Sequence, residues 1–177
     1  YYGVTPDISC FGKAMANGMP ISAIVGKKKI MKNFDKIFFS TTFGGETLSL
    51  VAAITTIKYL QKKNIINKIK KFSNKLIKDI NRIIYNQNLD KTFIVEGVWW
   101  RPAFGVYKGV NKKYLEILRK NLIKNKLLIG NSFNFCYAHT NTNTYKEIIT
   151  RIETSLKMTS KTKISIKNYI QKNSVRS

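Results

Sequence analysis

Acidic residues and histidine are scarce in this 177-residue chain, which has 9 Asp and Glu, 32 Lys and Arg, and a single His. One histidine and two cysteines cannot supply the cluster of His and Cys ligands that a structural metal site needs, so we expect no metal. Apolar runs of eighteen or more residues are also lacking, which excludes a membrane-spanning helix from the expected elements.

The two cysteines, Cys10 and Cys136, both fall in apolar runs with the pattern of strands. So few cysteines do not suit a disulfide-stabilised secreted scaffold. We expect both to be reduced thiols in the core of a cytoplasmic protein.

The shortage of acidic residues leaves a formal net charge of +23. A balance this basic is compatible with a nucleic-acid or anionic-surface partner. However, nearly all the basic residues are lysines scattered along helices and accompanied by many Ile and Asn, as an A+T-rich coding sequence produces. Arginine, the usual reader of base edges, is rare. The pattern favours a solvated lysine coat, and a basic nucleic-acid-binding protein is the alternative of another class.

A single lysine stands directly behind a short apolar run near the start of the chain. The run, residues 8–11, is followed by Gly12, Lys13, small residues and a Gly-x-Pro turn that leads to the next apolar run. We expect a lysine at a strand end, flanked by apolar side chains, to be partly desolvated. Desolvation lowers the pKa of an amine and allows it to attack a carbonyl. The segment indicates a Schiff-base lysine, and a surface lysine in a loop is the alternative.

A second candidate site precedes an amphipathic helix. The backbone amides near Gly44 and Gly45, with the Thr42 hydroxyl, could receive a phosphate group at the start of this helix. A glycine turn with threonine as a helix cap is the alternative. Glu46 suits the position, because a negative charge is favourable at a helix N-terminus.

Apolar spacing predicts alternating strands and helices, with an α+β lobe in the second half of the chain. The expected strands after the first apolar run are residues 21–26, 37–39, 93–100, 103–107, 127–129 and 133–137. The expected helices are residues 27–35, 47–62, 65–85, 112–125 and 144–158.

Three segments resemble class III aminotransferases. Residues 6–23 (PDISCFGKAMANGMPISA) resemble the family's pyridoxal-phosphate lysine segment. Residues 41–53 (TTFGGETLSLVAA) are similar to its Thr-x-Gly-Asn-Pro stretch with the Ala-Ala that follows. Residues 133–140 (FNFCYAHT) resemble the late strand of the glutamate-1-semialdehyde 2,1-aminomutase branch. The three occur in the family's order.

The resemblance implies an α/β fold, the C-terminal part of a fold type I pyridoxal-phosphate-dependent transferase. Residues 1–62 are then the end of the large cofactor domain, and residues 63–88 are a linking helix. Residues 89–159 are the small C-terminal α+β domain, and residues 160–177 are expected to be a disordered tail.

The resemblance also implies the chemistry. Lys13 would form a Schiff base with pyridoxal 5'-phosphate, and the enzyme would move an amino group between small-molecule donors and acceptors. Thr42 would contact the phosphate of the neighbouring subunit's cofactor, with Gly44 and Gly45 beside it, so a homodimer with shared active sites is expected. The family usually has Asn and Pro where this chain has Glu46 and Thr47, which puts the detail of the helix start in question.

Two further residues are candidate substrate contacts. Arg101 could hold a substrate carboxylate bidentately, or it could stack on Trp100 or cap a strand. His139 could act as a general base, or it could have a hydrogen-bonded structural role.

Within the family, the branch depends on the late strand. Ornithine-type relatives carry an arginine there for the substrate carboxylate, and residues 131–137 contain none. The resemblance therefore favours a glutamate-1-semialdehyde 2,1-aminomutase, with a sugar or semialdehyde transaminase as the alternative.

The chain begins with Tyr1 rather than Met. In relatives the acidic partner of the pyridine nitrogen, the other phosphate loop and the stacking aromatic all lie upstream of this point. We expect a C-terminal fragment that needs the upstream part for catalysis, and a non-catalytic remnant that only dimerises is the alternative.

Overall fold

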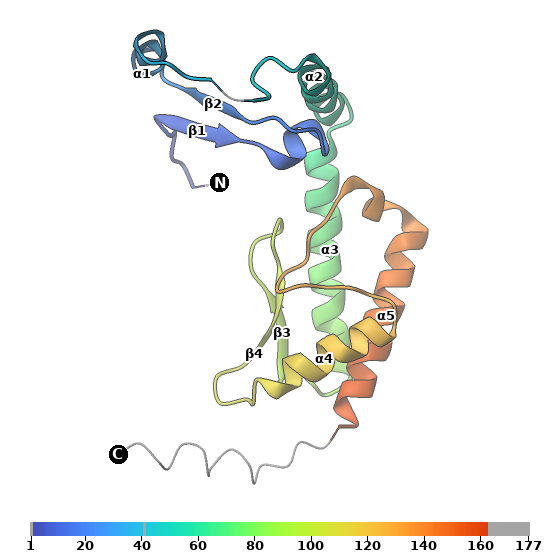
Figure 1. Cartoon of the computed structure of the whole chain (residues 1–177). Coiled ribbons are helices and arrows are strands. Elements are labelled where there is room, and N and C mark those ends of the chain that lie inside the picture. Colours follow the sequence, from blue (N-terminus) through green and yellow to red (C-terminus); the bar gives the residue numbers. More distant parts are fainter. Residues whose placement is uncertain (1, 41, 163–177) are drawn as a thin grey trace, which may run out of the picture. The chain divides into compact units, whose positions relative to one another are not determined.

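Figure 1 shows the computed structural model, which describes residues 2–40 and 42–162. The chain divides into two units, Tyr1–Ile65 and Ile66–Ser177. Each unit contains one two-stranded antiparallel sheet and its own helices. Most of the expected tail, residues 163–177, lies outside the described residues.

In the first unit, β1 (Ile8–Phe11) pairs with β2 (Ala23–Gly26), so that Ile8 faces Gly26 across the ladder. This register requires a glycine at position 26, because a Cβ atom there would lie 2.5 Å from the Asp7 carbonyl oxygen. The short helix η1 (Lys13–Ala16) leaves the end of β1, and a turn with positive φ at Gly18 returns the chain toward β2. The two predicted strands are confirmed, the second with a later start.

The rest of the unit is helical. A helical stretch made of α1 (Lys28–Met31) and η2 (Lys32–Lys36) confirms the short helix predicted over residues 27–35. Helix α2 (Thr47–Lys62) has the predicted bounds. The strand predicted over residues 37–39 is wrong, since these residues pair with no strand and Phe38 is 96% exposed.

Much of the first unit's apolar surface is exposed. The buried side chains include Ala16 of η1 and Ser49 and Ala53 of α2, where these two helices pack together. The apolar residues of this unit therefore do not form a core that the unit covers by itself. The large apolar residues left exposed include Ile8, Phe11, Val25, Ile37, Phe38, Phe39, Phe43, Leu48, Val51 and Ile54.

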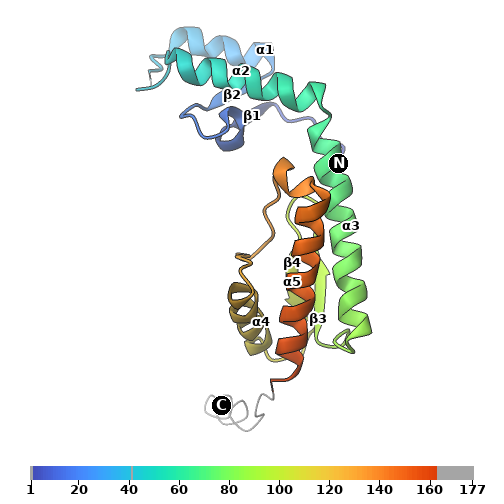
Figure 2. The same cartoon turned by 90° about the vertical axis from the view of Figure 1, so that its right-hand side faces the viewer.

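The second unit is built on α3 (Ile65–Asn86), a long amphipathic helix with lysines on its outer side. Strands β3 (Phe93–Glu96) and β4 (Ala103–Val106) pair antiparallel, and α4 (Lys113–Lys124) follows. After η3 (Tyr137–Thr140), α5 (Thr142–Ser160) runs beside α3, as both views show (Figure 2).

One hydrophobic core joins these elements. Helix α3 contributes Phe72, Leu76, Ile80 and Ile84 to this core, so the helix from Phe72 onward belongs structurally to the second unit. Burial of each large apolar side chain stabilises the fold by roughly 1.5–3 kcal/mol. The core residues are Phe72, Leu76, Ile80, Ile84, Leu89, Phe93, Val95, Leu118, Leu122, Phe133, Ile152 and Leu156.

Two predicted strands of this unit are wrong. Residues 127–129 and 133–137 are not strands; residues 133–136 are irregular and η3 begins at Tyr137. The Phe133 amide donates to the Pro102 carbonyl at 2.8 Å, and the Phe133 ring is buried, but no ladder continues from this bond. In the run over residues 127–129, Leu128 is 87% exposed, so this run is not buried along its whole length. Among residues 66–162, strands β3 and β4 give the lobe its α+β character.

Candidate active site

Lys13 lies where the sequence predicts, directly after the end of β1. It opens η1 and has a φ of +49°, a left-handed conformation that is uncommon for residues other than glycine. Such conformations cost energy and concentrate at functional sites. The packing of η1 against α2, through Ala16 and Ala53, fixes the backbone from which the lysine projects.

The predicted desolvation of Lys13 is wrong for the described structure, in which this residue is exposed. Ile8 and Phe11 of β1, which were expected to shield it, are exposed as well. The sheet of this unit has only two strands, and apolar strand residues bury a neighbour only when something covers their face. The amine is thus accessible for a ligand.

The second candidate site is a turn over Thr42–Gly45 that leads into α2. All four residues of the turn are exposed, and the Glu46 amide closes the turn by donating to the Phe43 carbonyl at 3.2 Å. A hydroxyl and a set of backbone amides at the start of a sixteen-residue helix are suitable donors for a phosphate group.

Glu46 caps α2 and uses part of this donor set. Its carboxylate accepts hydrogen bonds from the amides of Leu48 (2.7 Å) and Ser49 (2.6 Å). The interaction with Ser49 and donation by these two amides lower the pKa of Glu46 below its usual value. The negative charge predicted to suit the helix start is therefore confirmed, but it removes the Leu48 and Ser49 amides from the donors that a phosphate could use.

Arg101 and His139 lie in the second unit, whereas Lys13 and Thr42 lie in the first. The Arg101 guanidinium is exposed and donates through Nε to the Ser132 hydroxyl at 3.2 Å. The His139 ring accepts the Cys136 amide hydrogen through Nδ1 at 3.0 Å, which is a structural role of the kind considered for this residue. Within the first unit, over residues 2–40 and 42–65, no hydrogen bond joins Lys13 to Thr42, and within residues 66–162 of the second unit none joins Arg101 to His139.

The two cysteines are free, but the prediction that they are core thiols is wrong, since Cys10 and Cys136 are both exposed. Cys10 lies in β1 as predicted, on a sheet with exposed strand residues, and Cys136 precedes η3. In the described part of the chain no group of three or more His, Cys, Asp or Glu is placed to hold a metal ion. None of the helices described there is long and apolar enough to cross a membrane.

Comparison with known protein families shows which family this chain belongs to. Residues 1–97, which include Lys13 and the turn before α2, match the family model described as "Aminotransferase class-III". The chain belongs to the class III aminotransferase family. The resemblance of the lysine and threonine segments is thus confirmed at the level of the family.

Curated relatives of this class III aminotransferase chain include an aminotransferase and an aminomutase. A 3-aminobutyryl-CoA aminotransferase of Cloacimonas acidaminovorans is 34% identical over 148 residues, covering 78% of this chain and 34% of the relative. A glutamate-1-semialdehyde 2,1-aminomutase of Saccharolobus islandicus is 30% identical over 140 residues, covering 73% and 32%. The chain therefore spans about a third of the length of these relatives.

Solved structures show the same fold. The FumI protein of Sphingopyxis sp. MTA144, in its PLP (pyridoxal phosphate) internal aldimine form, matches with a TM-score of 0.79 and 19% identity, over 88% of this chain and 37% of that protein. The predicted α/β fold, as part of a fold type I transferase, is confirmed by this likeness.

Proposed function

We propose that this chain supplies the reactive lysine of a pyridoxal-phosphate-dependent enzyme that transfers amino groups. The observation that carries the proposal is the position of Lys13, which follows β1 with a left-handed backbone inside the family-matching segment. Since the chain spans about a third of its relatives' length, the activity is proposed for a protein that contains this segment together with the family's remaining parts.

The residues present fit the cofactor. Lys13 offers an exposed primary amine that can bind an aldehyde carbon. Thr42, Gly44 and Gly45 offer a hydroxyl and turn amides for a phosphate group. When bound, pyridoxal phosphate supplies the electron sink that stabilises a carbanion at the substrate carbon. The Lys13 Nζ would take a proton from the substrate carbon and return it to the product.

A homodimer with shared active sites is part of the proposal. The first unit exposes large apolar side chains on its sheet and along α2, among them Phe11, Val25, Val51 and Ile54. Apolar surface of this extent in one small unit is typical of protein interfaces. A second subunit would cover part of it and would bring its own Thr42 turn to the phosphate of the first subunit's cofactor.

For the substrate we propose a small-molecule amino donor and acceptor. The ending over residues 133–140 favours an aminomutase of the glutamate-1-semialdehyde type, and a semialdehyde or sugar transaminase is the alternative within the family. Arg101 has an exposed guanidinium and could contact a substrate carboxylate. For His139 the structural hydrogen bond to Cys136 supports a positioning role for the loop before α5.

We also propose the cytoplasm as the location. Two exposed cysteines without a disulfide suit a reducing compartment.

Amino transfer by the whole enzyme tests the proposed function. Lys13→Ala should lower the rate of transfer from a supplied amino donor by about 10³-fold, because the residue that moves the proton is lost. The matched control is Lys27→Ala, an exposed lysine beside β2 that pairs with Asp7, and it should keep the parent's rate within about twofold. Equal rates in the parent and the Lys13 variant would overturn the proposal.

A further inference from the structure

A groove of about 450 Å³ lies in the second unit between α3 and the segment from η3 to the start of α5. Its volume is that of a small-molecule site. Three lysines line it, and neither an arginine nor a carboxylate lies among its lining residues. Those residues are Lys68, Lys71, Phe72, Lys75, Tyr137, Thr140, Thr142 and Tyr145.

The three lysines come from one face of α3, at spacings of three and four residues. Lys68 and Lys75 are each held by an aromatic ring. The Lys68 ammonium lies 5.4 Å from the centre of the Tyr137 ring, and the Lys75 ammonium lies 3.8 Å from the centre of the Tyr145 ring. Both cations therefore contact aromatic side chains of the facing segment.

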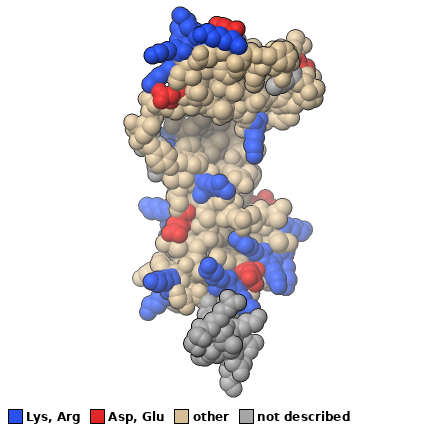
Figure 3. Space-filling model, turned by 60° about the vertical axis from the view of Figure 1, so that its left-hand side comes forward, with Lys and Arg blue, Asp and Glu red and all other residues tan. Residues whose placement is uncertain are grey.

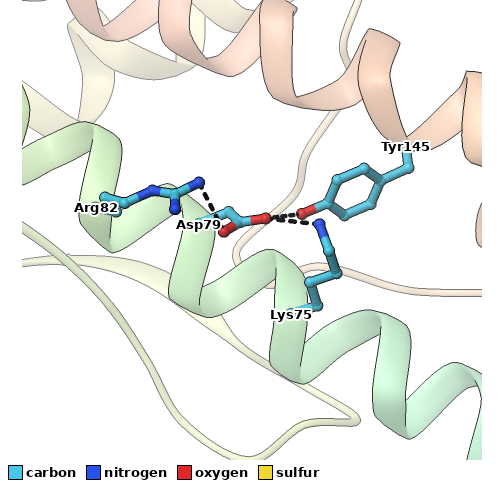
Figure 4. A network of polar contacts seen from close by, with 4 residues as sticks. All are labelled: Lys75, Asp79, Arg82 and Tyr145. Carbon is cyan, nitrogen blue, oxygen red and sulfur yellow. Dashed lines mark hydrogen bonds and ion pairs between the residues drawn. The ribbon is translucent and has the colours of Figure 1, made fainter.

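Figure 4 shows how the end of the groove at Lys75 is fixed. The Asp79 carboxylate accepts hydrogen bonds from the Lys75 ammonium at 2.8 Å and from the Tyr145 hydroxyl, and it pairs with Arg82 at 3.1 Å. The carboxylate is thus shared among three partners and neutralises at most one of the nearby cations.

Lys71 lies between these two anchored lysines. Within residues 2–40 and 42–162, neither Lys71 nor Lys68 forms an ion pair, and Lys71 makes no hydrogen bond. Like charges on neighbouring turns of a helix repel one another. An anion in the groove would remove this repulsion and give Lys71 its missing partner.

We propose that this groove binds the phosphate group of a small molecule. Lysine ammonium groups bind phosphate as point charges, and the lining has three lysines and no carboxylate. The Thr142 hydroxyl adds a donor on the opposite side, whereas the Thr140 hydroxyl already donates to the Tyr137 carbonyl at 2.7 Å. Thr142 is also the first residue of α5, and the start of a helix favours an anion. The inference concerns residues of the second unit only and does not depend on the proposed function.

The test is calorimetric titration of the full chain with two probes, inorganic pyrophosphate and ADP, at fixed ionic strength. Lys68→Gln/Lys71→Gln removes two charges from the groove and should weaken the binding of both probes about tenfold. The matched control, Lys70→Gln/Lys91→Gln, removes two charges from exposed lysines of the same unit outside the groove and should change the binding less than twofold.

Comparison of the probes identifies the source of the phosphate. Tighter binding of ADP than of pyrophosphate assigns the groove to a nucleotide-like ligand, and the reverse assigns it to a free phosphate. Equal losses in the groove and control variants would show only diffuse attraction to a basic chain and would overturn the site. Absence of binding by the folded parent would overturn the site as well. So would tighter binding of a mixed-sequence oligonucleotide whose affinity is unchanged by the groove substitutions.

Discussion

Asn81 of α3 pairs its side chain with the backbone of Val95 on β3 in both directions. The Asn81 amide nitrogen donates to the Val95 carbonyl at 2.9 Å, and the Val95 amide donates back to the Asn81 side-chain oxygen at 2.8 Å. Val95 itself is buried. One polar side chain thus satisfies two backbone groups of a strand whose other side pairs with β4.

Asn81→Ala should destabilise the second unit by about 2–3 kcal/mol, because it leaves two backbone groups of a buried residue without partners. Urea unfolding followed by tryptophan fluorescence measures this unit specifically, since both tryptophans of the chain, Trp99 and Trp100, belong to it. Asn74→Ala, at an exposed position of the same helix, is the control and should change the stability by less than about 0.5 kcal/mol. An equal effect of the two substitutions would contradict the pairing.

Neighbouring positions on α4 provide a second test of the core. Leu122 is 1% exposed and belongs to the core, whereas Ile123 is 58% exposed. Leu122→Ala should cost about 3 kcal/mol, because it removes buried methyl groups and leaves a cavity, and Ile123→Ala should cost well under about 1 kcal/mol. The same unfolding experiment measures both, and a reversed order would show that α4 packs through another face.

The stability of the second unit should fall at acidic pH partly through Asp79. Hydrogen bonds from Lys75 and Tyr145 lower the pKa of this carboxyl, whose side chain is 15% exposed. Its contribution is complete above the ordinary aspartate pKa of about 3.9 and is lost as the pH falls through the lowered folded-state value. Asp79→Asn should therefore flatten the loss of stability below about pH 4.

Asp90→Asn is the matched control for this pH dependence. Asp90 is exposed, and within the described ranges it forms no ion pair. Its replacement should leave the acid-side slope of the unfolding free energy unchanged, and a flattening as large as that of Asp79→Asn would refute the role of the network.

Glu46 should weaken phosphate binding at the turn before α2. Its carboxylate occupies the Leu48 and Ser49 amides and places a negative charge beside the proposed phosphate donors. Glu46→Asn keeps a residue suited to capping and removes the charge, so the affinity for pyridoxal phosphate of a protein that contains this chain with the family's remaining parts should rise about threefold. Absorbance titration measures the affinity and circular dichroism checks that α2 remains. An unchanged or lower affinity would place the phosphate elsewhere.

The helices could be predicted from the sequence because their evidence is local. Apolar residues spaced by three and four along α3 and the glutamate before α2 mark these elements without reference to the rest of the chain. The strands predicted over residues 37–39, 127–129 and 133–137 are wrong because a strand exists only where a second strand pairs with it. Phe133 shows the difficulty, since it is apolar and buried within an irregular segment.

In the candidate site too, features that depend on local sequence could be predicted, and features that depend on distant parts of the chain could not. The position of Lys13 behind a strand and the turn over Thr42–Gly45 before a helix follow from local motifs, and both are observed. The exposure of Lys13 and of both cysteines could not be predicted, because burial depends on what covers a surface. The groove beside α3 was also missed, although its signal is visible in the spacing of Lys68, Lys71 and Lys75. Nothing local indicates that Tyr137 and Tyr145 face these lysines.

The most direct measurement asks which lysine of this lysine-rich chain binds the cofactor. The protein that contains this chain with the family's remaining parts is incubated with substoichiometric pyridoxal phosphate, treated with borohydride to fix the bound cofactor, digested and mapped by mass spectrometry. Our account predicts that the label concentrates on the peptide containing Lys13 and that Lys13→Ala abolishes this peak without raising another to the same level. A label spread over many lysines, or concentrated on another one, would contradict the assignment of Lys13.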